Sequence, residues 1–169
     1  MKLTFDVTTK GFVAAFGRKK LKQVMEAAFL KAGLHWGRTF TDKHFTRAGA
    51  QEYGYARRKN ERLRPGSKSF RRYAGPAEKK AGEILPLVHS GELKQLAHTY
   101  RVTATSTSKK VMARIRLPAA RKLNLLPAKY RGDIHRISAA EMTLLVDVIN
   151  DELAAQYQRL TDKRRVRIA

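Results

Sequence analysis

Residues 138–160, SAAEMTLLVDVINDELAAQYQRL, hold the clearest secondary-structure signal in the chain. Ser138 and Glu141 have the spacing of an S-x-x-E capping box, in which each residue satisfies a free backbone N–H of the other at a helix start. Apolar side chains then recur every three or four residues, as on one face of a helix: Met142, Leu145, Val146, Ile149, Leu153 and Leu160. The stretch predicts a helix of about six turns. We expect its basic tail, residues 161–169, to fray or to dock on a partner.

A second amphipathic helix is predicted over residues 12–36, FVAAFGRKKLKQVMEAAFLKAGLHW. Its apolar stripe has helical spacing and lies apart from most of its lysines: Leu21, Val24, Met25, Ala28 and Ala32. We expect Gly33 to end or loosen this helix, because glycine lowers helix propensity. Trp36 and Phe40 extend the same face, and their interpretation is as core anchors rather than as ligand-stacking rings.

Three short segments alternate between apolar and polar residues, as half-buried strands do. They are residues 3–7, 99–106 and 111–117, and the last two predict a β-hairpin with Arg101, Arg114 and Arg116 facing outward. Ser90 is a candidate N-cap for a short helix that follows it. The order predicts an α+β fold: one domain over residues 1–169, with a small antiparallel sheet packed on two long helices.

Charge is the most unusual feature of the composition. The 169 residues include 36 Lys+Arg and 14 Asp+Glu, which gives a net charge of +22. Self-repulsion of this size opposes the compact state, so we expect a lasting polyanionic neighbour: nucleic acid, an acidic protein surface or an anionic membrane. The absence of cysteine excludes disulfides, thiol nucleophiles and cysteine-based metal sites. We find no signal peptide and no apolar run of about 20 residues, and we expect synthesis in the cytoplasm and no membrane partner.

Residues 57–72, RRKNERLRPGSKSFRR, concentrate this charge, since eight of the sixteen are Lys or Arg. They lie within residues 41–84, which show no clear period and predict a long, extended basic arm that is not ordered in isolation, with short helical pieces as an open alternative. The candidate contacts to a partner or to DNA are Arg57, Arg58, Lys59, Arg62, Arg64, Lys68, Arg71 and Arg72. Interleaved aromatic residues favour nucleic acid, because rings stack on bases: Tyr53, Tyr55, Phe70 and Tyr73. Acidic neighbouring subunits are the competing partner.

No pattern in the sequence indicates a catalytic or cofactor site. The five histidines, His35, His44, His89, His98 and His135, form no metal-like spacing, and no phosphate-binding loop or nucleophile motif occurs. Asp147, Asp151 and Glu152 could hold a metal, but counter-charge to the basic surface is the simpler interpretation. We therefore expect neither an enzyme nor a cofactor, and a small basic nuclease or toxin stays as a residual alternative.

Two segments carry a family resemblance. HFTRAGAQEYGYARR (44–58), a basic stretch, and then LPLVHSGELKQLA (85–97) resemble the tail-completion and neck proteins of tailed phages. In that group a helix and a mobile segment precede an apolar–Ser/Thr-Gly-x-Leu motif, which is followed by a hairpin or small sheet and a helix. The motif residues here are Leu87, Val88, Ser90, Gly91 and Leu93. The resemblance covers residues 18–117 in the order of elements.

The resemblance implies a structural protein of the virion, located at the head–tail junction. Such proteins form rings, commonly sixfold or twelvefold, between the portal-bound adaptor and the tail tube or its terminator protein. The basic arm would then interlock with neighbouring subunits, with DNA contact secondary. The alternative is a nonspecific nucleic-acid-binding protein that contacts the phosphate backbone and weakens steeply with salt.

Overall fold

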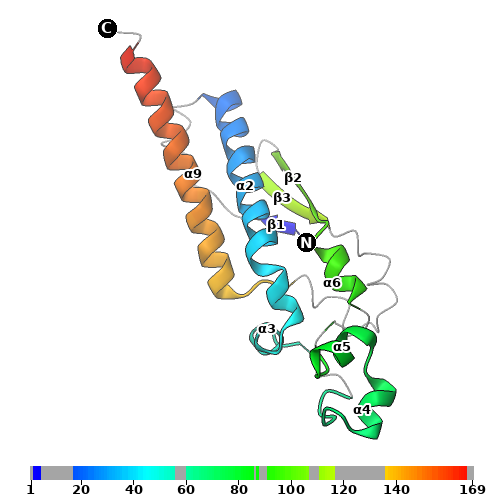
Figure 1. The fold of residues 1–169 in the computed structure, drawn as a ribbon. Helices are drawn as coiled ribbons and strands as arrows, with labels where there is room; N and C mark the ends of the chain where they lie inside the picture. The colour runs from blue at the N-terminus through cyan, green and yellow to red at the C-terminus, as the bar shows by residue number, and fades with distance from the viewer. Residues whose placement is uncertain are drawn as a thin grey trace. The chain divides into compact units, whose positions relative to one another are not determined.

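The computed structural model describes residues 2–4, 17–55, 60–85, 87, 91–106, 111–116 and 136–166. Their helices are α2 (Arg18–Phe40), the 3-10 helix η1 (Asp42–Phe45), α3 (Arg47–Glu52), α4 (Lys68–Tyr73), α5 (Pro76–Ala81), α6 (Glu92–Ala97) and α9 (Ala139–Val166). Their strands are β1 (Lys2–Thr4), β2 (Arg101–Ser106) and β3 (Val111–Arg116). Two long helices and a small sheet confirm the α+β class (Figure 1).

The single domain that we expected is subdivided into two compact units. Described residues within Met1–Trp36, Val102–Arg116 and Ala140–Ala169 form the first unit, and those within Gly37–Arg101 and Leu117–Ala139 form the second. Helix α2 runs without a break from the first unit into the second. Each unit buries its own set of apolar side chains, so each is described by itself.

The sheet of the first unit has the strand order β1-β3-β2. Strands β2 and β3 are the predicted hairpin, which is confirmed. Strand β1 pairs with β3 in antiparallel register, with Leu3 opposite Ala113. Ala113 and Ile115 of β3 are buried, whereas Arg114 and Arg116 are exposed, as the alternation predicted. The predicted strand over residues 3–7 is β1 as far as Thr4, and residues 5–7 lie outside the described part.

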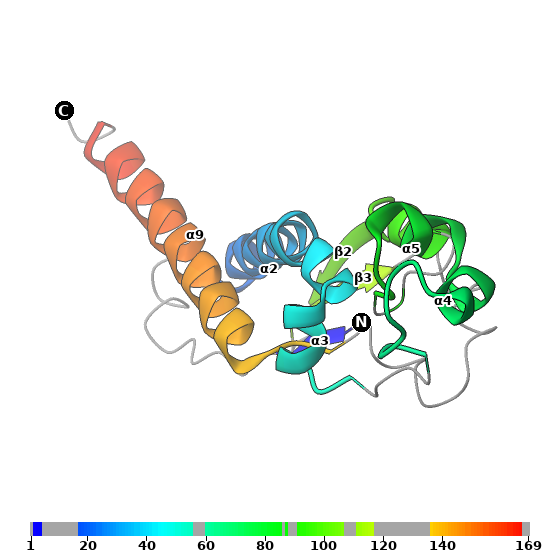
Figure 2. The ribbon, with the colours of Figure 1, turned by 60° about the horizontal axis from the view of Figure 1, so that its bottom comes forward.

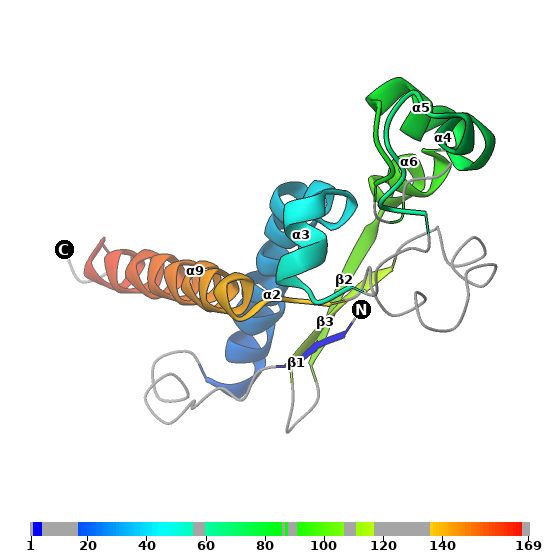
Figure 3. The same ribbon diagram turned by 90° about the horizontal axis from the view of Figure 1, so that it is seen from below.

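Helices α2 and α9 of the first unit run in opposite directions (Figure 1), and in the view from below α9 leads away from α2 toward its C-terminus (Figure 3). Two side-chain contacts define this register. The Trp36 indole Nε1 donates to Oε2 of Glu141 at 3.2 Å, and the Lys31 ammonium lies 2.7 Å from Oε2 of Glu152. Trp36 and Glu141 are both about 1% exposed, so the carboxylate satisfies the indole N–H inside the core. Glu141 therefore holds the two helices together, and its place in a capping box with Ser138 stays a prediction.

The buried face of α9 is narrower than its apolar pattern suggested. Leu145, Ile149 and Leu153 are buried as predicted, but Met142 and Val146 are 36% and 37% exposed, so their assignment to the core is wrong. The polar residues Glu141 and Glu152 occupy part of the helix face toward the core and bind α2. Met142 and Val146 therefore lie at the edge of the buried face. The side chain of Leu160 lies outside the described part.

Helix α9 also extends further than predicted, because residues 161–166 of the basic tail continue it to Val166. The segment TDKRRV contains no Gly or Pro to stop a helix. Its cations are favourable at a helix C-terminus, where the helix dipole is negative. Residues 167–169 lie outside the described part.

Gly33 does not end α2, and this prediction is wrong, because the helix continues to Phe40. A Cβ at Gly33 would lie 2.6 Å from Cγ1 of Val102, so the glycine lets β2 approach the helix closely. Figure 2 shows α2 beside this hairpin. Trp36 and Phe40 are buried, as expected for core anchors. The predicted helical residues 12–16 lie outside the described part.

Residues 41–84, which belong to the second unit, differ most from the prediction. Their described part contains four short helical elements, η1, α3, α4 and α5, so the short helical pieces are present and the extended arm is wrong (Figures 1 and 2). Local caps start three of these helices. Thr46 Oγ1 accepts from the Gly49 N–H at 3.0 Å, Ser67 Oγ accepts from the Phe70 N–H at 3.1 Å, and Glu78 Oε2 accepts from the Gly75 N–H at 2.8 Å.

These short helices pack through one or two buried residues each, rather than through a repeating apolar stripe. One cluster contains Phe45, Leu93 and Ala97, and another contains Phe70, Ala74 and Ile84. Each short helix contributes only one or two buried residues, so the sequence shows no period, although the segment has a core. Whether it keeps this structure in isolation stays a prediction.

We expect Gly49→Ala to destabilise the second unit. A Cβ at Gly49 would lie 1.9 Å from the carbonyl oxygen of Lys43, and backbone cannot rotate away as a side chain can. Overpacking of this kind typically costs about 1–3 kcal/mol. Chemical denaturation should show a lower free energy of unfolding for this variant than for Ala48→Ser, which changes an exposed residue of the same helix. Equal stabilities would contradict the packing described at Gly49.

Candidate functional site

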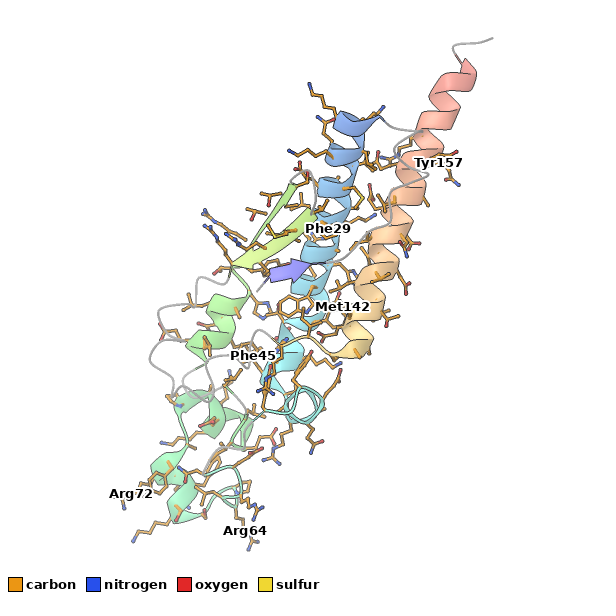
Figure 4. All side chains as sticks on the ribbon, turned by 180° about the vertical axis from the view of Figure 1, so that it is seen from behind. Phe29, Phe45, Arg64, Arg72, Met142 and Tyr157 are labelled. Carbon is orange, nitrogen blue, oxygen red and sulfur yellow. The ribbon has the colours of Figure 1, made fainter. Side chains whose placement is uncertain are left out.

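The second unit carries a group of exposed cations close together in the sequence, which we name the basic surface. It consists of Arg62, Arg64, Lys68, Arg71, Arg72, Lys79 and Lys80, all exposed. The only acidic residue between Arg62 and Ala81 is Glu78, which is fully buried. Within this range no exposed carboxylate offsets the charge, and the flanking acids Glu61 and Glu83 are half-buried. Figure 4 shows Arg64 and Arg72 extending away from the ribbon.

The local fold aims these cations outward. Phe70 of α4 is buried in a cluster with Ala74, Ile84 and the half-buried Leu63. Because one face of α4 is anchored there, the neighbouring Arg71 and Arg72 face solvent. Arg71 Nε donates to the carbonyl oxygen of Gly66 at 3.2 Å, which ties α4 to the turn before it.

Helix α5 adds Lys79 and Lys80 to the basic surface. The buried carboxylate of Glu78 caps the start of this helix through the Gly75 N–H. Gly82 ends it in the left-handed conformation, with φ of 73°. The sequence analysis did not single out Lys79 and Lys80. The only signal for them was two adjacent lysines directly after a glutamate.

The predicted contact residues are brought together only in part. Arg62, Arg64, Lys68, Arg71 and Arg72 all belong to the basic surface. The other three, Arg57, Arg58 and Lys59, lie outside the described part.

The predicted aromatic interleaving is largely wrong. Tyr53 and Phe70 are 6% and 4% exposed, so both are core residues rather than stacking platforms. Tyr55 is half-buried. Tyr73 is 47% exposed, and the Arg72 guanidinium carbon lies 5.5 Å from the centre of its ring. A basic surface with one such ring suits phosphate or carboxylate contacts better than base stacking along a strand.

An aromatic cluster that the sequence did not reveal fixes the chain ahead of the basic surface. His44 stacks on Tyr53 with ring centres 4.2 Å apart, and its Nδ1 forms a hydrogen bond with the Tyr55 hydroxyl. Arg136 donates to the carbonyl oxygens of Tyr53 and Gly54 at 2.8 and 2.7 Å. Since Arg136 is 83 residues from Tyr53, no local pattern could have indicated this contact.

The Leu-x-x-Ser-Gly-x-Leu motif serves the core of the second unit. Leu93 is buried with Phe45 and Ala97, and the partly buried Leu87 packs against them. Gly91 occupies the N-cap of α6 with φ of 83°, and a Cβ there would lie 3.2 Å from that of Ala77. The prediction of Ser90 as the N-cap is therefore wrong, because the left-handed turn places Gly91 there. Val88 and Ser90 lie outside the described part.

Ion pairs hold the motif helix and its neighbours in place. Asp42 of η1 lies 2.9 Å from the Lys94 ammonium and 3.2 Å from the His98 ring nitrogen, both of α6 or its C-cap. The hydrogen bond from Lys94 is the main cause that lowers the pKa of Asp42, against the opposing effect of partial burial. Lys43 likewise lowers the pKa of Glu52 through a hydrogen bond. These acids are thus neutralised locally, while the cations of the basic surface are not.

Other kinds of site find no support in the described part of the chain. No group of three His, Asp or Glu side chains there could hold a metal ion. No helix of the described residues has the length and apolar character to cross a membrane. No family model, curated protein or solved structure matches the chain.

We expect the Asp42 ion pairs to contribute to stability only above acidic pH. The folded-state pKa of Asp42 is lowered, so its contribution is fully present above the unfolded pKa of about 3.9 and is lost as pH falls through the folded pKa. The carboxylate is about 60% exposed, so the contribution is at most about 1 kcal/mol. Denaturation of wild type and Asp42→Asn should differ at pH 6, and the difference should shrink as pH falls below the unfolded pKa of about 3.9. A difference that persists at the lower pH would contradict this assignment.

Proposed function

We propose that this protein is a structural, non-enzymatic component of the head–tail junction of a tailed phage. In this role it would join the portal or adaptor complex to the tail as a ring of neck or tail-completion subunits. Its location would then be the virion, after synthesis in the host cytoplasm.

The order of elements carries the proposal. Helix α2 is followed by the segment that contains the basic surface, then by the Gly91-x-Leu93 turn, the β2–β3 hairpin and the long helix α9. The family resemblance implies this same order. The buried Leu93 and left-handed Gly91 give the short motif a packing role in positioning α6.

The charge distribution supports an assembly protein. A charge of +22 opposes close packing of identical copies unless acidic surfaces are supplied to meet it. At a junction between rings, carboxylates of neighbouring proteins can pair with the guanidinium groups of the basic surface in bidentate geometry. The seven exposed cations then act in docking, and DNA contact is secondary.

Light scattering of the purified chain at low and high salt, with and without duplex DNA, tests this proposal. We expect either a discrete oligomer of the 19.2-kDa chain whose mass does not depend on DNA, or a monomer that ignores DNA and binds a purified portal, adaptor or tail-tube ring. A monomer with no affinity for any of these components would overturn the proposal.

A nonspecific nucleic-acid-binding protein is the second candidate, and the basic surface favours it specifically. No exposed acid lies between Arg62 and Lys80, and the exposed ring of Tyr73 lies among these cations. Such a surface would neutralise phosphates and release their counterions, without reading base sequence.

Salt titration of DNA binding tests the second candidate. We expect the double substitution Arg71→Glu and Arg72→Glu to weaken duplex binding and to reduce the slope of log K against log salt by about 2. The matched control is Lys19→Glu with Lys20→Glu, which makes the same charge change on exposed residues of α2. Equal effects of the two pairs would mean that net charge, not this surface, governs binding. Absence of binding even at about 50 mM salt would exclude the candidate.

A further inference from the structure

The first 20 residues of helix α9, residues 139–158, belong to the one long part of this basic chain that carries no cation. No Lys, Arg or His occurs from Ile137 to Gln158, although these 22 residues include four of the chain's fourteen acids. Two of the four are used inside the first unit, because Glu141 accepts from Trp36 and Glu152 pairs with Lys31. The other two, Asp147 and Asp151, are exposed, and no described cation forms an ion pair with either.

Apolar side chains share the exposed part of α9 with these two carboxylates. Four of the six large hydrophobic residues that are exposed in the described chain belong to this helix: Met142, Leu144, Val146 and Tyr157. Figure 4 marks Met142 and Tyr157 on it. Single exposed apolar residues are ordinary, but a concentration on one helix marks an interaction surface.

Helical geometry places the acidic and apolar residues in two strips on the exposed side of α9. Leu144, Asp147 and Asp151 are spaced i, i+3 and i+7, and therefore form one strip along the helix. Met142, Val146 and Tyr157 form a second strip at the other edge of the exposed side. Between the two strips lie the exposed residues Thr143, Asn150 and Ala154. We name this combined surface the α9 face.

We propose that the α9 face of one copy docks on the basic surface of a second copy of this chain. The contact pairs Asp147 and Asp151 with arginines of α4, and it covers the exposed apolar side chains of α9 beside Tyr73. This inference rests on the proposed function and specifies the contact between its subunits.

Charge complementarity selects this occupant. Two copies with a net charge of +22 repel each other over most approaches. The α9 face, with two exposed carboxylates and no cation, is where a second copy is attracted instead. The basic surface is its complement, with seven exposed cations and no exposed acid. Nucleic acid fits the α9 face poorly, because phosphates would meet two carboxylates.

The contact joins two different surfaces, so it is heterologous. Each copy in such a contact keeps one α9 face and one basic surface available for the next copy. Repetition generates a closed ring when the rotation between copies closes, and an open filament when it does not. An arrangement of this kind suits a protein that forms a ring around an axis.

A charge exchange between two variants of the full chain tests the contact. The first variant carries Asp147→Lys and Asp151→Lys, and the second carries Arg71→Glu and Arg72→Glu. Each variant alone should lose the oligomer seen for the wild type in light scattering. An equimolar mixture should recover it, because the new lysines of the first variant meet the new glutamates of the second. The remaining contacts in the mixture are of the wild-type kind.

Further variants separate charge pairing from misfolding. A single chain with all four substitutions should also form the oligomer, which shows that each substituted surface folds. Asp147→Asn with Asp151→Asn should weaken the oligomer less than the lysine pair does. Lys19→Glu with Lys20→Glu should leave it intact, since these exposed residues belong to neither surface.

The outcomes distinguish this contact from the proposed function. An oligomer that ignores both charge changes, or single variants that the mixture does not rescue, would overturn the contact and leave the junction role standing. A wild-type chain that stays monomeric at every concentration would also overturn the contact. If only DNA binding responds, falling with the α4 change and rising with the α9 change, the basic surface belongs to nucleic acid and the contact is wrong.

Discussion

The excess of cations is the constraint on which the rest of this structure depends. With 36 Lys+Arg and 14 Asp+Glu, the chain must fold against its own electrostatic repulsion. Several of its carboxylates are placed where each has a specific task. Glu141 accepts the Trp36 indole inside the first unit, and Glu78 caps α5 inside the second. Glu152 and Asp42 pair with lysines of another helix in their own units.

This use of the acids leaves the cations to face outward. A buried or paired carboxylate stabilises the fold, but it cannot offset charge elsewhere on the surface, because exposed charges more than about 10 Å apart are largely screened. The basic surface is thus unbalanced as a direct result of how the interior is built. Asp147 and Asp151 depart from this pattern, since they stay exposed on a helix that binds α2 through Glu141 and Glu152. A partner would therefore supply the opposite charge both to the cations of the basic surface and to these two acids.

Prediction from the sequence succeeded where the spacing of apolar residues along one strand or helix indicates which side chains are buried. The alternation of residues 111–116 gave the exposed Arg114 and buried Ile115 of β3, and the helical spacing of Val24, Ala28 and Ala32 gave the buried face of α2. It failed where burial depends on a distant neighbour. Gly33 is inside a helix because β2 approaches it, and Met142 is exposed because the core-facing arc of α9 is narrow. The basic surface was anticipated for five of its seven residues, since charge runs are visible without a fold, whereas Lys79 and Lys80 join it only through the position of α5.

By itself, the amino-acid sequence determined the α+β class, the two long helices, the hairpin and the large positive charge. These follow from periodicity and composition, which are properties of neighbouring residues. The tertiary structure alone decided that residues 41–84 fold around single anchors such as Phe45 and Phe70, and that Tyr53 stacks on His44 and receives Arg136 at its carbonyl. It also decided which acids are buried or paired within the fold and which remain exposed. The physical reason is that burial and pairing are set by contacts between residues far apart in the chain, and no local pattern encodes them.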